Sequence, residues 1–214
     1  MNETIVIPFR GPRGAKSRLD AVLEDWVRES LAMSLFKHVL SEVIDAGCGR
    51  VLVLTNSPEA ASHAGICGVD VLRETTGSLN AALAYARKSL MSSGAERMAV
   101  IAADLPMLGS QDVIALLDAG AGGFAIAPDK GGSGTNAIAV PVRASFTFRY
   151  GHKSLAAHRK QASRLGLAEA LVGEIGLAAD LDEPHDLALL SESYVKLSPR
   201  VRRAIARART LHDL

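Results

Sequence analysis

The sequence has little that would anchor the protein in a membrane or cross-link it. Among its 214 residues, no apolar run reaches the ~18 residues that a membrane-spanning helix needs, and the first residues lack the pattern of a signal peptide. Cys48 and Cys67 are the only cysteines, and their spacing fits neither a metal site nor a redox pair. We therefore expect reduced, inert thiols and a cytoplasmic protein.

A broad basic surface is also missing. The net charge is +1, but six cations lie in the C-terminal tail with no acid among them: Lys196, Arg200, Arg202, Arg203, Arg207 and Arg209. The rest of the chain therefore carries a net charge of −5, which argues against nucleic acid as a partner. Hydrophobic residues make up 48% of the chain and charged residues 22%, which is typical of a globular protein with one sizeable core.

Apolar runs alternate with helical patterns along the chain. The strands that we expect are residues 4–8, 51–55, 69–73, 98–103, 124–128 and 137–141. Helices are expected at residues 28–46, 79–91, 110–119, 154–165 and 183–193, and Asn56-Ser57-Pro58 signals a turn and a further helix start. This alternation predicts one α/β domain in which helices cover both faces of a mostly parallel sheet.

The basic tail begins with its own helix signal. Ser198-Pro199 combines an N-cap residue with proline at the first helical position, and arginines follow. We therefore divide the chain into a domain of residues 1–193 and a basic C-terminal helix in residues 194–214. The sequence does not decide whether this helix contacts a second subunit, meets an acidic partner or lies in solvent, so a homodimer remains open.

One carboxylate stands directly after an apolar run. The run Met98–Ala103 reads as a buried parallel strand, and Pro106 prevents its continuation beyond Asp104. Asp104 is therefore expected at the carboxyl end of a strand, where open α/β sheets bind their ligands. A carboxylate there suits a divalent cation held against a phosphate. The alternative is an aspartate that only caps a turn.

Cations and glycines crowd the loop after the first expected strand: Arg10, Gly11, Arg13, Gly14, Lys16 and Arg18. Glycine lets backbone N–H groups approach an anion, and a following helix N-terminus adds partial positive charge. The spacing does not match the phosphate loop GxxxxGK(S/T), because Ala15 separates Gly14 from Lys16. The position of the loop favours triphosphate binding over the alternative of a solvated basic loop.

Two later segments offer further anion sites. The hydroxyls and N–H groups of residues 133–135 suit a carboxylate or a phosphate, although a plain hairpin between two strands is the alternative. Gly151 and Ser154 stand at a helix start, a second geometry that binds anions. His158 is interpreted as a surface or core histidine rather than a metal ligand.

Two more carboxylates follow in an extended segment. Asp180 and Asp182 are two residues apart, so a strand-like backbone directs both side chains to the same side. Together with Asp104 they predict a carboxylate set for magnesium. Alternatively, Asp182 only caps the helix that starts near Pro184, and Asp186 is interpreted as a charge on the surface of that helix.

In their order and spacing, these segments resemble the CofC family, guanylyltransferases of coenzyme F-420 biosynthesis, within a nucleotidyltransferase superfamily that includes the molybdenum-cofactor guanylyltransferases. The resemblance runs from Ile5 to about Leu187. It depends on six motifs: Ala15–Leu19, Ser78–Asn80, Ala103–Pro106, Gly134–Asn136, Tyr150–Ser154 and Asp180–Pro184. It implies a Rossmann-like three-layer sandwich of the nucleotide-diphospho-sugar-transferase type.

The resemblance also implies an activity, a metal and a set of site residues. The activity is Mg²⁺-dependent transfer of GMP from GTP to 2-phospho-L-lactate, phosphoenolpyruvate or 3-phosphoglycerate, with release of pyrophosphate. The implied residues are Lys16, Arg10 and Asp104 for catalysis; Pro8, Gly11, Gly14, Arg18, Leu79 and Asn80 for the nucleotide; Thr135, Gly151 and Ser154 for the phospho-acid; and Asp104, Asp180 and Asp182 for magnesium. The alternatives are a molybdopterin-type or sugar-type nucleotidyltransferase and a non-catalytic nucleotide-binding protein.

Two positions depart from the family pattern. The first-strand motif usually reads Pro-x-Lys, and Arg10 stands in the place of the lysine. Arginine binds phosphate through a planar fork and does not replace lysine one for one. The late motif usually has threonine before its proline, where this chain has Glu183. Both changes bear on substrate choice more than on the class of reaction.

Overall fold

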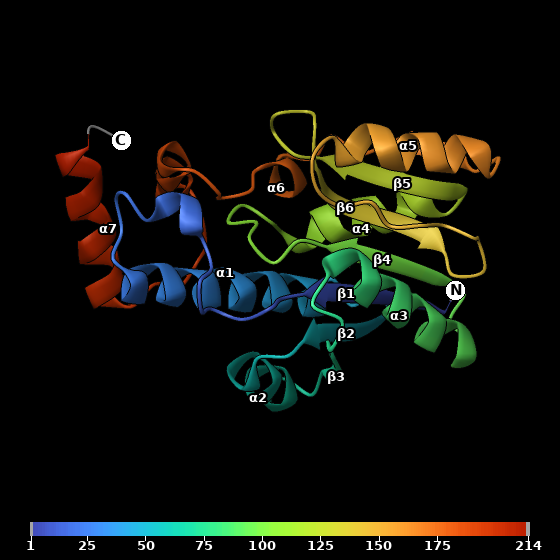
Figure 1. Ribbon diagram of the computed structural model, residues 1–214, viewed down its shortest axis with the longest axis horizontal. Helices are drawn as coiled ribbons and strands as arrows, with labels where there is room; N and C mark the ends of the chain where they lie inside the picture. Colours follow the sequence, from blue (N-terminus) through green and yellow to red (C-terminus); the bar gives the residue numbers. More distant parts are fainter. Residues whose placement is uncertain (1, 213–214) are drawn as a thin grey trace.

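The computed structural model describes residues 2–212, and its sheet has the strand order β3-β2-β1-β4-β6-β5-β7 (Figure 1). The strands are β1 (Glu3–Pro8), β2 (Arg50–Thr55), β3 (Asp70–Arg73), β4 (Arg97–Ile101), β5 (Gly123–Pro128), β6 (Thr135–Pro141) and β7 (Ala168–Leu171). β6 runs antiparallel to its neighbours β4 and β5, and the other pairs are parallel. The mostly parallel sheet predicted from the sequence is confirmed.

Helices cover both faces of this sheet, which gives three layers (Figure 1). One face packs against α1 (Asp25–Asp45), α2 (Pro58–Ile66), α4 (Ser110–Gly120) and the short α6 (Ile175–Ala178). The other face packs against α3 (Leu79–Ser92) and α5 (Ser154–Arg164). Successive side chains of a strand point to opposite faces, so Ile5 and Ile7 of β1 join the first core and Val6 joins the second.

A third hydrophobic cluster lies beyond the sheet, around the first half of α1. It contains Leu19 of the 3₁₀ helix η1 (Ser17–Leu19), Leu187 of the 3₁₀ helix η2 (Pro184–Ser191), and the apolar side of α7 (Pro199–Leu211). Figure 1 shows α7 against the beginning of α1, at the opposite end of that helix from the sheet. The Ser198 hydroxyl accepts a 3.3 Å hydrogen bond from the N–H of Val201, so the predicted helix start is confirmed.

The structure differs from the sequence-based expectation mainly in short elements. β7 and α6 were not expected, because four residues each are too few to show a clear apolar period. β4 ends at Ile101, two residues before the expected strand end at Ala103. The expected helix at 183–193 is the 3₁₀ helix η2. Within residues 2–212, no helix is both long and apolar enough to cross a membrane.

Candidate active site

A cleft of about 740 Å³ opens at the carboxyl ends of β1 and β4. The two strands are neighbours, but the chain continues from β1 toward β2 on one side, whereas β6 and β5 lie beyond β4 on the other. Such a change of direction leaves a crevice that binds ligands in open α/β sheets. The cleft is lined by most of the loop at residues 8–16, by Ala102–Asp104, and by Leu79, Tyr150 and Asp182.

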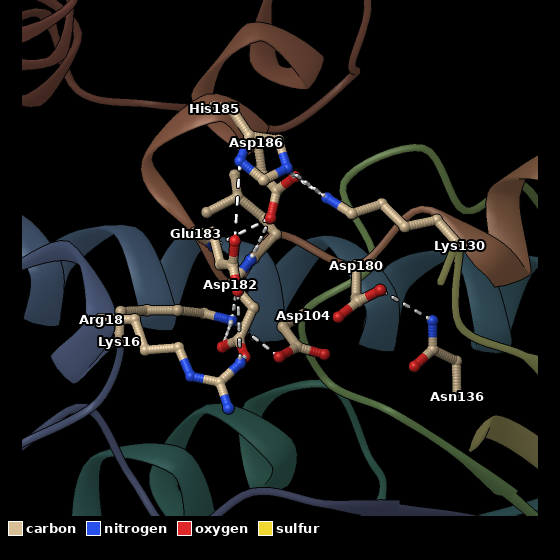
Figure 2. Close-up of polar contacts among 11 residues, drawn as sticks. Lys16, Arg18, Asp104, Lys130, Asn136, Asp180, Asp182, Glu183, His185 and Asp186 are labelled. Atoms are coloured by element: carbon tan, nitrogen blue, oxygen red, sulfur yellow. Dashed lines mark hydrogen bonds and ion pairs between the residues drawn. The ribbon is translucent and has the colours of Figure 1, made fainter. Parts of the chain in front are cut away.

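Lys16 supplies a cation that is buried among carboxylates. Its backbone lies in the left-handed region at φ 55°, directly before η1, whose Leu19 is fully buried and anchors the turn. The Lys16 side chain is 6% exposed, and its Nζ donates to Oδ2 of Asp104 at 2.7 Å and to the carbonyl oxygen of Leu181. The same Nζ lies 3.8 Å from Oδ1 of Asp182 (Figure 2). One ammonium group therefore partly neutralises two carboxylates.

Two of the three predicted carboxylates, Asp104 and Asp182, line the cleft, and Asp180 lies to one side of them outside the lining (Figure 2). The backbone N–H of Leu181 donates to the carbonyl oxygen of Asp104 at 3.1 Å, which ties the turn after β4 to the acidic segment. Oδ1 of Asp180 accepts a 3.2 Å hydrogen bond from Nδ2 of Asn136. Burial raises the pKa of Asp180, the Asn136 hydrogen bond opposes this shift, and the negative charges of Asp104 and Asp182 raise the pKa further.

This donor set fits Mg²⁺ that binds together with a nucleotide. Within residues 2–212, no group of three or more acidic, histidine or cysteine side chains is arranged to hold a metal ion alone. Asp104 and Asp180 nevertheless offer the hard oxygen ligands that Mg²⁺ prefers, and proteins usually hold this ion by one or two carboxylates plus substrate phosphates. Asp180 has no ion-pair partner among residues 2–212, so a divalent cation would compensate its negative charge.

Asp186, rather than Asp182, caps η2. Oδ2 of Asp186 accepts hydrogen bonds from the backbone N–H groups of Asp182 at 2.9 Å and Glu183 at 2.8 Å. Its Oδ1 pairs with the ammonium of Lys130 from the β5–β6 loop, and the residue is 2% exposed. The interpretation of Asp186 as a surface charge is therefore wrong. The Asp182 carboxylate lines the cleft instead of capping the helix.

The residues expected to hold the phospho-acid form a polar corner of the cleft. Thr135 and Gly151 line the cleft, and Ser154 lies behind Thr135, with its hydroxyl donating to Oγ1 of Thr135 at 3.2 Å. Lys153, at φ 56°, starts α5 with a left-handed backbone. Among residues 2–212, no acceptor faces the N–H groups of Gly151 and Lys153, so this helix start can bind an anion.

The residues expected around the nucleotide are only partly gathered. Pro8, Arg10, Gly11 and Gly14 line the cleft with Lys16. The Arg10 guanidinium donates to the carbonyl oxygen of Gly77 at 2.9 Å, which links the basic loop to the segment before α3. Arg18 is more exposed and pairs with Oδ2 of Asp182 at 2.6 Å, outside the cleft lining. A phosphate role for these cations stays a prediction.

The side-chain amide of Asn80 makes two hydrogen bonds to the backbone of Tyr150. Oδ1 of Asn80 accepts from the N–H of Tyr150 at 2.7 Å, and its Nδ2 donates to the carbonyl oxygen of Tyr150 at 3.1 Å. The cleft is lined by Leu79 and Tyr150, and Asn80 itself is absent from the lining. Its amide therefore positions a cleft residue, while base recognition by Asn80 stays a prediction.

Sequence reasoning assigned no site role to Asn136 or His158. The position of Asn136 follows from the alternation of side chains along β6. Thr135 contacts His158 on one side of the strand, so the side chain of Asn136 points to the other side, toward Asp180. The signal for His158 is its distance of four residues from Ser154, which places both on one side of α5. His158 is a core histidine, as one of the two interpretations had it.

Comparison with known proteins identifies relatives over most of the chain. The sequence profile of a family described as "Guanylyl transferase CofC like" matches residues 3–192, which leaves α7 outside the match. A phosphoenolpyruvate guanylyltransferase from Rubrobacter xylanophilus is 37% identical over 195 residues, which cover 90% of this chain and 95% of the relative. A 3-phospho-D-glycerate guanylyltransferase from Phenylobacterium zucineum is 36% identical over 190 residues, which cover 85% of this chain and 86% of the relative.

The fold also matches a solved structure. A crystal structure from Desulfovibrio desulfuricans G20, described as a nucleotide-diphospho-sugar transferase, superimposes with a TM-score of 0.75 at 16% identity. The superposition covers 99% of this chain and 96% of that one. The predicted type of three-layer fold is confirmed.

Proposed function

Because this chain belongs to the CofC-like guanylyl transferase family, we propose that it transfers GMP from GTP to a small phosphorylated carboxylic acid and releases pyrophosphate. The family resemblance associates this reaction with coenzyme F-420 biosynthesis. One structural observation supports it most directly: a buried Lys16 beside Asp104 and Asp182 in the main cleft. A cation among carboxylates at a strand end suits a site that binds a triphosphate with a metal.

The proposed reaction is a displacement at the α-phosphorus of GTP. A phosphate oxygen of the acid forms a bond to that phosphorus, and the bond from the phosphorus to the bridging oxygen of the β-phosphate breaks. Pyrophosphate leaves with the electron pair of the broken bond. The attacking phosphate is already ionised at neutral pH, so no general base is required. Catalysis by the protein then consists of positioning and charge neutralisation.

The residues of the cleft divide between these two tasks. Lys16 neutralises charge that develops on the departing pyrophosphate, and Arg10 assists after releasing Gly77. Asp104 and Asp180, with Asp182 nearby, would hold Mg²⁺. The chemistry that a bound Mg²⁺ supplies there is charge neutralisation on the phosphate oxygens of GTP. Thr135, Gly151 and the start of α5 bind the acid.

The test is an assay of pyrophosphate release by the purified protein. Each nucleoside triphosphate is combined with Mg²⁺ and with phosphoenolpyruvate, 3-phosphoglycerate or 2-phospho-L-lactate in turn. This chain is 37% identical to a phosphoenolpyruvate guanylyltransferase and 36% identical to a 3-phospho-D-glycerate guanylyltransferase, so identity does not favour either acid. The assay decides among the three acids. We expect release with GTP that depends on one of the acids. No release with any of the three acids would favour a molybdopterin-type or sugar-type nucleotidyltransferase, and GTP binding without any product would favour a non-catalytic nucleotide-binding protein.

A further inference from the structure

A buried histidine lies behind the polar corner of the cleft that is formed by Thr135, Gly151 and Ser154, and the proposed reaction gives it no role. His158 of α5 is fully buried, and its ring packs edge-on against Tyr150 with ring centroids 4.9 Å apart. Both ring nitrogens have partners. Nε2 lies 2.8 Å from the backbone nitrogen of Arg149, and Nδ1 lies 3.1 Å from Oγ1 of Thr135.

The backbone of Arg149 determines the tautomer of this ring. A backbone N–H only donates, so Nε2 of His158 must be the unprotonated nitrogen that accepts. The single proton of the neutral ring is therefore on Nδ1, and Nδ1–H donates to Oγ1 of Thr135. A protonated ring would place a hydrogen on Nε2, directly facing the Arg149 N–H.

This proton in turn determines what the Thr135 hydroxyl can do. Oγ1 of Thr135 accepts from Nδ1–H of His158 and from the hydroxyl of Ser154, which occupies both of its lone pairs. The hydrogen of the Thr135 hydroxyl then has no acceptor among residues 2–212, and Thr135 lines the cleft, whereas Ser154 lies buried behind it.

We propose that His158 is a positioning residue for the acceptor substrate: it holds the Thr135–Ser154 pair as a hydrogen-bond donor, so that the corner selects an anionic oxygen of the phospho-acid. This inference rests on the proposed function, because it assigns the corner to the acid. A donor-only corner favours a carboxylate or phosphate oxygen and disfavours a substrate that offers an N–H or O–H there. We therefore expect the substrate to place an oxygen that accepts a hydrogen bond at this corner.

The test separates this role from a structural one by comparing KM values. His158→Phe keeps a buried ring and removes both nitrogens, whereas His158→Asn keeps an N–H near the position of Nδ1. We expect His158→Phe to raise the KM for the acid about tenfold while the KM for GTP changes less than about twofold. His158→Asn should recover most of the affinity. His63→Phe, which removes an imidazole from α2 on the other face of the sheet, is the matched control.

A double-mutant cycle then asks whether His158 acts through Thr135. Thr135→Val should weaken acid binding, and the double variant His158→Phe/Thr135→Val should bind the acid no more weakly than Thr135→Val alone. Additive losses, or equal rises of KM for GTP and acid, would overturn the inference. Circular dichroism of each variant establishes that it is folded.

Two measurements keep the inference distinct from the proposed function. Titration calorimetry with phosphoenolpyruvate or 3-phosphoglycerate measures acid binding without turnover, and ¹⁵N NMR of labelled histidine reports the tautomer. If wild type binds an acid but releases no pyrophosphate, the proposed function fails, and weaker binding by His158→Phe still supports the inference. An Nε2–H tautomer for His158, or no binding of any acid by wild type, would refute it.

Discussion

Nζ of Lys16 donates to Oδ2 of Asp104 across 88 residues of sequence, at 2.7 Å, with the lysine side chain almost completely buried. Burial of a charged group is costly unless a partner and hydrogen bonds compensate it. The carbonyl oxygen of Leu181 and the carboxylate of Asp182 supply the rest of that compensation. The loop after β1 and the turn after β4 are therefore joined by an ion pair between two residues that line the cleft.

Asp104→Asn should reduce turnover steeply without unfolding the protein. The substitution keeps the shape of the side chain but removes one negative charge at the proposed metal and phosphate position. We expect kcat to fall about a hundredfold, the usual consequence of losing one strong electrostatic contact to the transition state. Asp70→Asn, which removes an exposed partner of Arg50 on the edge strand β3, should leave kcat unchanged. Near-normal kcat in Asp104→Asn would remove Asp104 from the active site.

Asp180→Asn should change the requirement for Mg²⁺ more than the affinity for GTP alone. Of Asp104, Asp180 and Asp182, only Asp180 has no ion-pair partner among the described residues, and an amide is a weaker ligand for Mg²⁺. We expect half-maximal activity at an Mg²⁺ concentration at least about tenfold higher than for wild type. Chelation of the metal should abolish activity, and added Mg²⁺ should restore it. The rate as a function of Mg²⁺ concentration is the measurement, and an unchanged curve would exclude Asp180 as a ligand.

Strand ends could be predicted from the sequence because long apolar runs stop at recognisable residues. The run before Asp104 was enough to place this carboxylate close to a strand end at the edge of the sheet. Asp180 and Asp182 follow α6 in a segment without a strand, and Asp182 approaches Asp104 through their shared partner Lys16. By contrast, β7 and α6 contain four residues each, too few for a period to be visible. Their positions depend on packing against β5 and α4.

Contacts between distant segments could not be predicted in the same way. Asp186 looks like a surface charge in sequence, but Lys130 from another loop and two backbone N–H groups surround it. The role of His158 likewise depends on which nitrogen meets the backbone of Arg149. Sequence spacing identifies a shared helical face, but not the partner that packs against it.

Acidification should destabilise the protein through His158. Burial lowers the pKa of His158 in the folded state to about 4, whereas an unfolded histidine titrates near 6.5. Between these values the unfolded chain binds the proton and the folded protein does not, so stability falls as the pH drops from about 6.5 to about 4. From pH 7 to pH 5 this contribution amounts to roughly 2 kcal/mol. Urea unfolding of wild type and of His158→Asn checks it, because the variant should lose less stability over that range. Equal losses in both proteins would contradict the buried, neutral state of the ring.

The C-terminal helix α7 should stabilise the hydrophobic cluster that contains Leu19, rather than only add surface charge. Ile205 of α7 is 4% exposed and belongs to the same cluster as Leu19, the residue that anchors the turn after Lys16. Ile205→Ala removes buried methyl and methylene groups and should lower the free energy of unfolding by about 2–4 kcal/mol. Arg203→Ala on the exposed side of the same helix should change it by less than about 0.5 kcal/mol. Chemical denaturation of both variants measures the difference. If Ile205→Ala is as stable as Arg203→Ala, α7 does not support the cluster that contains Leu19.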